Sequence, residues 1–178
     1  MIRNHLLVLG CLAIVTLAAT PGARTDAQTS SLPGGASSLS ETYGDWRVGC
    51  VQNGSTKRCV LSQIQARPNR QRVLAIELGA PLGNTASGTL ALPIGLALES
   101  GATFQIDEKP AMRPIRFRTC LPTGCLADVA FDGPTLAALR AGAVLKVKTA
   151  ADDGAAIPFS ISLRGFGAAL DRIGMLAR

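Results

Sequence analysis

The chain has 178 residues, of which 47% are hydrophobic and 17% charged, and its formal net charge is +6. It is long enough to bury a hydrophobic core as one domain. The 18 Lys and Arg residues are spread without a run of five, which argues against a nucleic-acid-binding arm and leaves anionic lipid, lipopolysaccharide or glycan as acidic partners.

The first 27 residues predict a signal peptide. Arg3 lies in a short basic leader, and the mostly apolar run 6–19 is shorter than the roughly 20 residues that span a bilayer. Small residues at the two positions that a signal peptidase reads predict cleavage between Ala27 and Gln28. The protein is therefore expected in the periplasm, at the outer membrane, or secreted.

Residues 28–40 are rich in Ser and Gly with few apolar anchors, a composition typical of a flexible linker. The folded domain is assigned to residues 41–178. Within it, short segments of alternating apolar and polar residues between turn signals predict strands. The expected strands are 46–51, 58–65, 73–78, 89–98, 103–106, a hairpin within 115–131, 144–149 and 157–163.

Pro93 interrupts the long apolar segment 89–98. Proline cannot donate a hydrogen bond to a neighbouring strand, so this strand is expected either to lie at a sheet edge or to bend there. Short helices are expected at 134–140 and 165–173. About eight short strands without strand–helix alternation predict an all-β sandwich. Trp46 is expected in its core, with the indole N–H bonded within the sheet.

Four of the five cysteines fall in the predicted domain. Disulfides are typical of an exported chain, and of three possible pairings Cys50–Cys59 and Cys120–Cys125 are the local ones, each joining the arms of an expected hairpin. A four-cysteine zinc site is the alternative, but the separation of Cys50 from Cys59 fits its usual spacing poorly. A lipoprotein signal ending at Cys11 is disfavoured because the apolar run continues past it.

Catalytic machinery is not indicated in the mature chain. Cleavage of the leader removes His5, the only histidine, which excludes Ser-His and Cys-His catalysis. The neighbouring carboxylates Asp107-Glu108 and Asp152-Asp153 lie beside turn residues and are interpreted as solvated turns. We therefore expect no enzyme, no metal site and no cofactor.

Two arginine clusters are candidates for contact with an anionic surface. Their members are Arg67, Arg70 and Arg72, and then Arg113, Arg116 and Arg118. The simpler interpretation is ordinary solvated charge on an outward face. The alternative is a single ridge, in which the planar guanidinium groups would suit phosphate or carboxylate. An apolar contact at Pro93 or at the hairpin tip 121–123 is a further possibility.

Four sequence blocks occur in order along the domain. They are Tyr43-Gly-Asp-Trp46 followed by Cys50 and Cys59, Leu92-Pro-Ile-Gly-Leu96, Cys120-x-x-x-Gly-Cys125, and Ile161-Ser-Leu-Arg-Gly-Phe166 followed by Ala168 and Ala169. Together they resemble the invasion-associated locus B family of bacterial envelope proteins. The resemblance implies an immunoglobulin-like antiparallel β-sandwich, export across the inner membrane, no established enzymatic activity, and a link in some members to host-cell invasion.

The function expected from these features is that of a non-catalytic exported envelope protein acting by surface contact. Its partner would be an envelope or host-surface protein, or an anionic lipid or lipopolysaccharide, and no nucleic acid or transmembrane span is expected in the mature chain. A periplasmic small-ligand-binding or inhibitor module is the alternative, and a large apolar pocket with convergent polar groups would favour it. Clustered carboxylates with shifted titration would favour an enzyme.

Overall fold

The computed structural model describes residues 32–178, so the predicted signal peptide and its cleavage site lie outside the described residues. The strands are β1 (Ser38–Tyr43), β2 (Trp46–Asn53), β3 (Thr56–Ala66), β4 (Arg72–Gly79), β5 (Ala86–Leu92), β6 (Thr103–Ile106), β7 (Phe117–Leu121), β8 (Gly124–Phe131), β9 (Val144–Ala150) and β10 (Ala156–Ser162). The α-helices are α1 (Gly133–Ala141) and α2 (Phe166–Leu176), and the 3-10 helices are η1 (Pro33–Gly35) and η2 (Leu98–Ser100).

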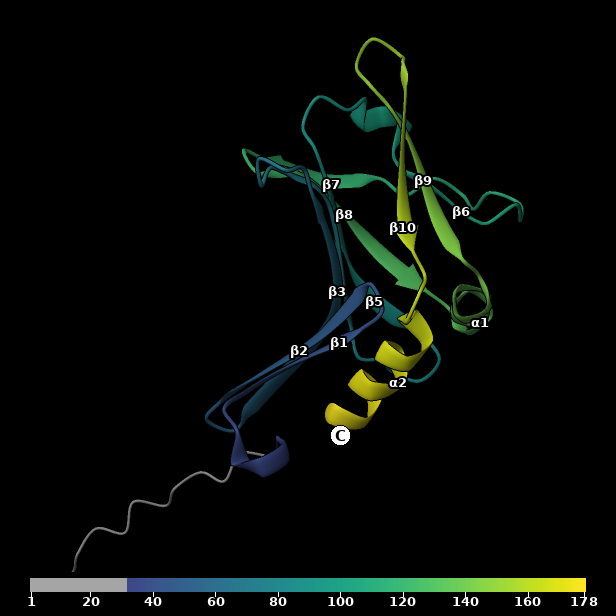
Figure 1. Ribbon diagram of the computed structural model, residues 1–178. Coiled ribbons are helices and arrows are strands. Elements are labelled where there is room, and N and C mark those ends of the chain that lie inside the picture. The colour runs from purple at the N-terminus through teal and green to yellow at the C-terminus, as the bar shows by residue number, and fades with distance from the viewer. Residues whose placement is uncertain (1–31) are drawn as a thin grey trace, which may run out of the picture.

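Two antiparallel sheets build the fold. The larger has the strand order β1-β2-β3-β4-β5-β8-β7, and the smaller has the order β10-β9-β6. The smaller sheet and α2 lie on the same side of the large, curved sheet (Figure 1). The other face of the large sheet has only exposed or half-buried residues along β2, as expected for an antiparallel sheet with one solvated face. The expected all-β antiparallel sandwich with two short helices is confirmed.

The core is organised around two aromatic pairs. Trp46 of β2 packs edge-on against Phe166 of α2 with ring centroids 5.1 Å apart, and Phe104 of β6 packs against Phe131 of β8 at 5.5 Å. Trp46 is buried as expected. Its indole N–H donates to the Ser162 carbonyl oxygen at 2.8 Å, so it joins β2 to the end of β10 in the other sheet. The expectation of a bond within its own sheet was wrong.

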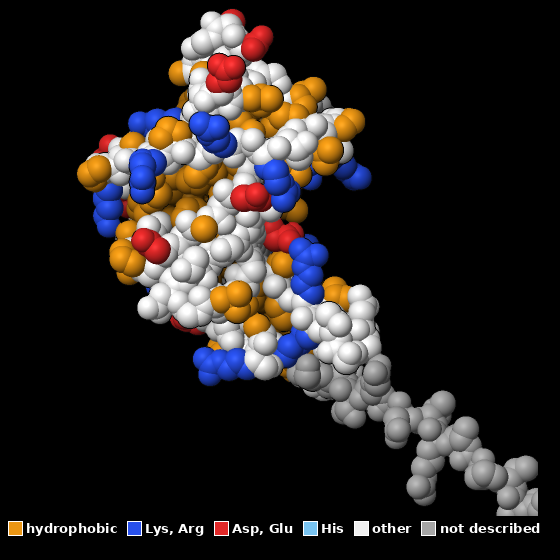
Figure 2. Space-filling view, turned by 180° about the vertical axis from the view of Figure 1, so that it is seen from behind, with side chains coloured by type: hydrophobic (Ala, Val, Ile, Leu, Met, Phe, Trp, Pro, Cys, Tyr) orange, Lys and Arg blue, Asp and Glu red, His pale blue; other side chains and the backbone are white. Residues whose placement is uncertain are grey.

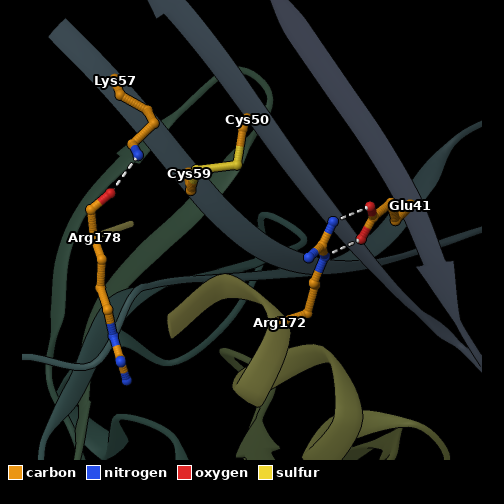
Figure 3. Close-up of a disulfide and its surroundings, with 6 residues drawn as sticks. All are labelled: Glu41, Cys50, Lys57, Cys59, Arg172 and Arg178. Carbon is orange, nitrogen blue, oxygen red and sulfur yellow. Dashed lines mark hydrogen bonds and ion pairs between the residues drawn. A yellow bond between two sulfur atoms is a disulfide. The ribbon is translucent and has the colours of Figure 1, made fainter. Parts of the chain in front are cut away.

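Helix α2 closes the open end of the sandwich over β1, β2 and β3. Its buried residues Phe166, Ala169, Leu170 and Ile173 follow helical spacing. The helix begins after Gly165, whose φ of 86° and the approach of Tyr43 O to within 2.0 Å of an ideal Cβ both require glycine. Figure 3 shows the ion pair that ties the helix to β1, between Arg172 and Glu41.

Strand β1 begins earlier than the sequence indicates. Residues 38–40 were assigned to the flexible linker, yet Ser38, Leu39 and Ser40 pair with β2 in regular antiparallel register. Leu32, further upstream, is only 3% exposed and belongs to the core. The serines of this edge strand give little apolar alternation, which explains why composition alone suggests a linker.

Strand β5 ends at Leu92, directly before Pro93. It lies between β4 and β8, so of the two expected alternatives the edge position was wrong, and the chain leaves the sheet at the proline. The apolar residues that follow form a loop and η2 rather than a continued strand. This loop becomes part of the candidate site.

Candidate functional site

Both predicted disulfides are present. Cys50 is bonded to Cys59 across β2 and β3, and Cys120 is bonded to Cys125 across β7 and β8. No thiol of these four is available as a zinc ligand. Among residues 32–178 there is also no group of three or more side chains that could hold a metal ion.

Three loops meet at one end of the large sheet. They are the β3–β4 turn, the segment after β5, and the β7–β8 tip, of which the first and last lie together at the upper left of Figure 1. The guanidinium Nη2 of Arg72 donates to Thr123 O at 2.9 Å, so it fastens the first loop to the tip. Gly124 adopts φ 137° and lies so close to Leu92 O that a Cβ would approach it to 2.4 Å. These contacts determine the position of the tip.

We call this the loop-end surface and define it by seven residues. They are Arg67, Arg70, Arg72, Ile94, Leu121, Pro122 and Thr123. All seven are exposed to solvent. The segments 66–72, 93–97 and 121–124 that carry them contain no Asp or Glu, so the positive charge of the arginines is not compensated within these loops.

The β3–β4 turn presents its arginines through a closed backbone. Arg67 N donates to Gln71 O at 2.9 Å, Arg70 N donates to Arg67 O at 2.8 Å, and Arg67 Nη1 donates to the Gln71 side chain at 3.2 Å. Arg70 has φ 65°, in the left-handed region that Gly and Asn occupy more readily. A charged residue therefore stands at a strained turn position where Gly or Asn would be less costly.

The members of the second arginine cluster have different surroundings. Arg118 pairs with Asp128 of β8 at 3.2 Å. Arg116 lines a depression together with Glu99. Arg113 lies in a segment that runs beside β6, since Met112 N donates to Phe104 O at 2.8 Å in the small sheet. Arg113, Arg116 and Arg118 are all exposed, and none of them lines the depression that includes Arg72.

Exposed aliphatic side chains accompany the first cluster. Ile94 is 63% exposed and Leu121 is 47% exposed. Arg72, Ile94, Pro122 and Thr123 line a depression of ≈ 330 Å³. In the space-filling view, seen from behind, this end projects at the upper right, where hydrophobic side chains lie on the surface beside Lys or Arg (Figure 2). The site therefore combines uncompensated positive charge with exposed apolar surface.

The carboxylates considered for catalysis have structural roles or lie in turns. Asp107 accepts hydrogen bonds from the backbone N–H groups of Ala143 and Val144, and Glu108 pairs with Lys146 at 2.5 Å. Asp152 and Asp153 lie in the exposed β9–β10 turn. They do not form a paired-carboxylate site.

The most perturbed carboxylate is Asp45, at the β1–β2 turn. Hydrogen bonds from Arg164 and then from the Ser162 hydroxyl lower its pKa to about 2. Arg164 Nη2 lies 2.5 Å from Asp45 Oδ1, and Ser162 Oγ donates to Oδ2 at 2.6 Å. A carboxylate held ionised in this way fastens the turn to the residues between β10 and α2 and is unsuited to act as a base near neutral pH.

A second depression lies on the outer face of the large sheet. It encloses ≈ 360 Å³ over Gly49, between Val51 and Val60, with the Arg58–Glu77 ion pair at its rim. Its charged groups are already paired with each other at 2.9 Å and do not converge on the hollow.

No helix of residues 32–178 is long and apolar enough to cross a membrane.

Sequence reasoning missed Ile94 as a surface residue. The apolar run around it suggested a buried strand, and only the termination at Pro93 leaves it exposed. The available signal was the Pro-Ile-Gly triplet, since proline followed closely by glycine marks a loop. The tip 121–123 was considered as an apolar contact, and the structure places it beside the arginine loop.

The comparisons with known proteins agree with this fold. The family model described as "Invasion associated locus B (IalB) protein" matches residues 46–174. An invasion protein B homolog of Brucella abortus is 46% identical over 151 residues, covering 84% of this chain and 87% of that protein. Invasion protein B of Bartonella bacilliformis is 31% identical over 159 residues, covering 88% and 86%.

A comparison with a solved structure indicates the same family. The crystal structure of invasion associated protein B from Bartonella henselae is 30% identical, has a TM-score of 0.73, and is matched over 78% of this chain and 97% of that one. The resemblance of the four sequence blocks is thus confirmed by the family model, by relatives matched over most of their length and by the fold. This chain belongs to the invasion associated locus B family.

Proposed function

We propose that the protein is a non-catalytic exported envelope protein that acts by surface contact, with the loop-end surface as its contact region. The observation that carries the proposal is the convergence of Arg67, Arg70 and Arg72 with exposed aliphatic residues, in loops without a carboxylate. The names of the relatives support an association with invasion, and the signal-peptide pattern supports export.

The charge of the contact region indicates an anionic partner. Guanidinium groups bind phosphate and carboxylate in planar, two-pronged geometry. Exposed charges attract such a partner over about 10 Å at 0.1 M salt, so binding should depend on ionic strength. Arg118 contributes less than the sequence suggests because Asp128 compensates it.

The test is binding of the exported protein, with both disulfides intact, to envelope and host-membrane preparations over a range of salt concentrations. We expect binding to weaken steeply with salt and to weaken further when Arg67, Arg70 and Arg72 are changed together to Ser. Changing Arg116 and Arg118 to Ser should have a smaller effect. Salt-insensitive binding that all these substitutions leave unchanged would show that the arginines do not mediate the contact. Turnover of a substrate by the pure protein would refute the non-catalytic proposal.

A further inference from the structure

The loop-end surface has a second property besides its charge. Ile94, in the segment after β5, and Leu121, the last residue of β7, are both exposed. Ile94 lines the same depression as Arg72, and Leu121 directly precedes Pro122, which also lines it. Exposed apolar surface that is rimmed by polar or charged residues is a feature of protein and membrane interaction sites. The arrangement of apolar tips next to arginines matches the two layers of a bilayer surface, acyl chains beneath and phosphates above.

We infer that the loop-end surface docks onto an anionic phospholipid bilayer, with Ile94 and Leu121 entering the boundary between headgroups and acyl chains. The inference rests on the proposed function and names the partner of the same surface. Arg67, Arg70 and Arg72 then contact headgroup phosphates.

The position of Arg72 supports a headgroup contact. One of its N–H groups is used by Thr123 O at 2.9 Å, which holds the guanidinium beside the depression of ≈ 330 Å³ that Ile94 and Pro122 also line. A phospholipid whose phosphate met the guanidinium of Arg72 would at the same time bring its glycerol end against the apolar side chains. Charge complementarity and apolar contact would thus be satisfied by one kind of molecule.

The strained turn is consistent with this role. Arg70 keeps a left-handed backbone at the turn, where Asn would fit with less strain. Arg70 is therefore not present at this position to stabilise the turn. A long cationic side chain at the tip of a membrane-facing loop would reach the phosphate layer.

The experiment is sedimentation of the exported protein with vesicles of phosphatidylglycerol and phosphatidylcholine in equal amounts, compared with phosphatidylcholine alone. We expect binding to the anionic vesicles only. Ile94→Ser and Leu121→Ser should each weaken it about tenfold, and Arg70→Asn should weaken it about fivefold. The matched controls are Leu82→Ser, an 86% exposed leucine at the opposite end of the sheet, and Arg58→Asn, an arginine already paired with Glu77.

Insertion is measured separately with Ile94→Trp. Trp46 is 1% exposed, so a blue shift of emission on adding anionic vesicles would come from the new indole. We expect this shift with Ile94→Trp and none with Leu82→Trp.

Three outcomes would overturn the inference: no binding to the anionic vesicles, binding that Ile94→Ser and Leu121→Ser leave unchanged, or no emission shift. In each case salt-sensitive binding to envelope preparations would still support the proposed function, and loss of that binding after protease treatment of the preparations would identify a protein partner instead. Vesicle insertion together with salt-insensitive envelope binding would support insertion of Ile94 and Leu121 and contradict the proposed arginine contact.

Discussion

Arg70 holds a backbone conformation that most side chains avoid, with φ 65° at the tip of the β3–β4 turn. The left-handed region costs an L-residue roughly 1–2 kcal/mol, and Asn tolerates it better than Arg. We predict that Arg70→Asn raises the free energy of unfolding by up to about 1 kcal/mol, measured by urea denaturation. Arg67→Asn in the same turn should give no gain, because Arg67 lacks the positive φ. A loss of stability in Arg70→Asn would contradict the account.

Asp45 is the residue whose titration should be visible in stability. Its pKa in the folded protein is about 2, below the value of about 3.9 expected when unfolded. Because the folded pKa is the lower one, the stabilisation is present in full above about pH 5 and is lost as pH falls toward 2.

We therefore predict that the stability difference between the native protein and Asp45→Asn is constant above about pH 5 and shrinks between about pH 4 and 2. Urea denaturation at a series of pH values measures it. Asp152→Asn, in the exposed β9–β10 turn, is the control for replacing a surface carboxylate by an amide. A difference for Asp45→Asn that persists unchanged to pH 2 would show that Arg164 and Ser162 do not hold the ionised carboxylate.

The two disulfide-bonded hairpins differ in access to solvent. Cys50 and Cys59 are both buried under the α2 side of the sheet, whereas Cys120 is exposed at the β7–β8 tip. Each bond closes a short loop and contributes about 2–3 kcal/mol by restricting the unfolded chain. A thiol reagent must reach a sulfur atom, so exposure governs which bond opens first.

We predict that mild reductant followed by alkylation labels Cys120 and Cys125 before Cys50 and Cys59, as read by peptide mass mapping. Cys120→Ser with Cys125→Ser should leave a folded domain, since Cys120 is exposed and only Cys125 of the pair is buried. Replacing Cys50 and Cys59 by Ser should destabilise more, because two polar hydroxyls instead of one would be placed at buried positions. Simultaneous labelling of all four cysteines would indicate global unfolding instead.

At the scale of the whole molecule, the described domain is closed by contacts between distant parts of the chain. Lys57 Nζ donates to Arg178 O at 2.7 Å, and α2 packs on the strands at the beginning of the chain (Figure 3). The mature domain is therefore expected to need residues from β1 to the C-terminus.

We predict Gln28 as the first residue of the protein recovered from the envelope fraction, measured by mass spectrometry. Retention of Met1, or a lipid on Cys11, would contradict cleavage after Ala27.

Local sequence determined most of the strands. Alternation of Trp46, Val48 and Cys50 with polar or small residues predicted β2, and the same pattern predicted β3, β4, β6, β9 and β10 within a few residues. The sequence also predicted the hairpin between Cys120 and Cys125, both disulfide pairings and the two helices. Turn residues and cysteines that are close in the sequence act over short distances, so local sequence is sufficient to predict them.

Only the tertiary structure decided which residues meet at the loop-end surface. Ile94 is exposed because β5, held between β4 and β8, stops at Pro93, and Arg72 reaches Thr123 across 51 positions of sequence. The tertiary structure also places the Arg113 segment beside β6 of the small sheet, where Met112 N donates to Phe104 O. Strand order and the side of a sheet on which a loop emerges depend on long-range pairing, and no local periodicity encodes that pairing.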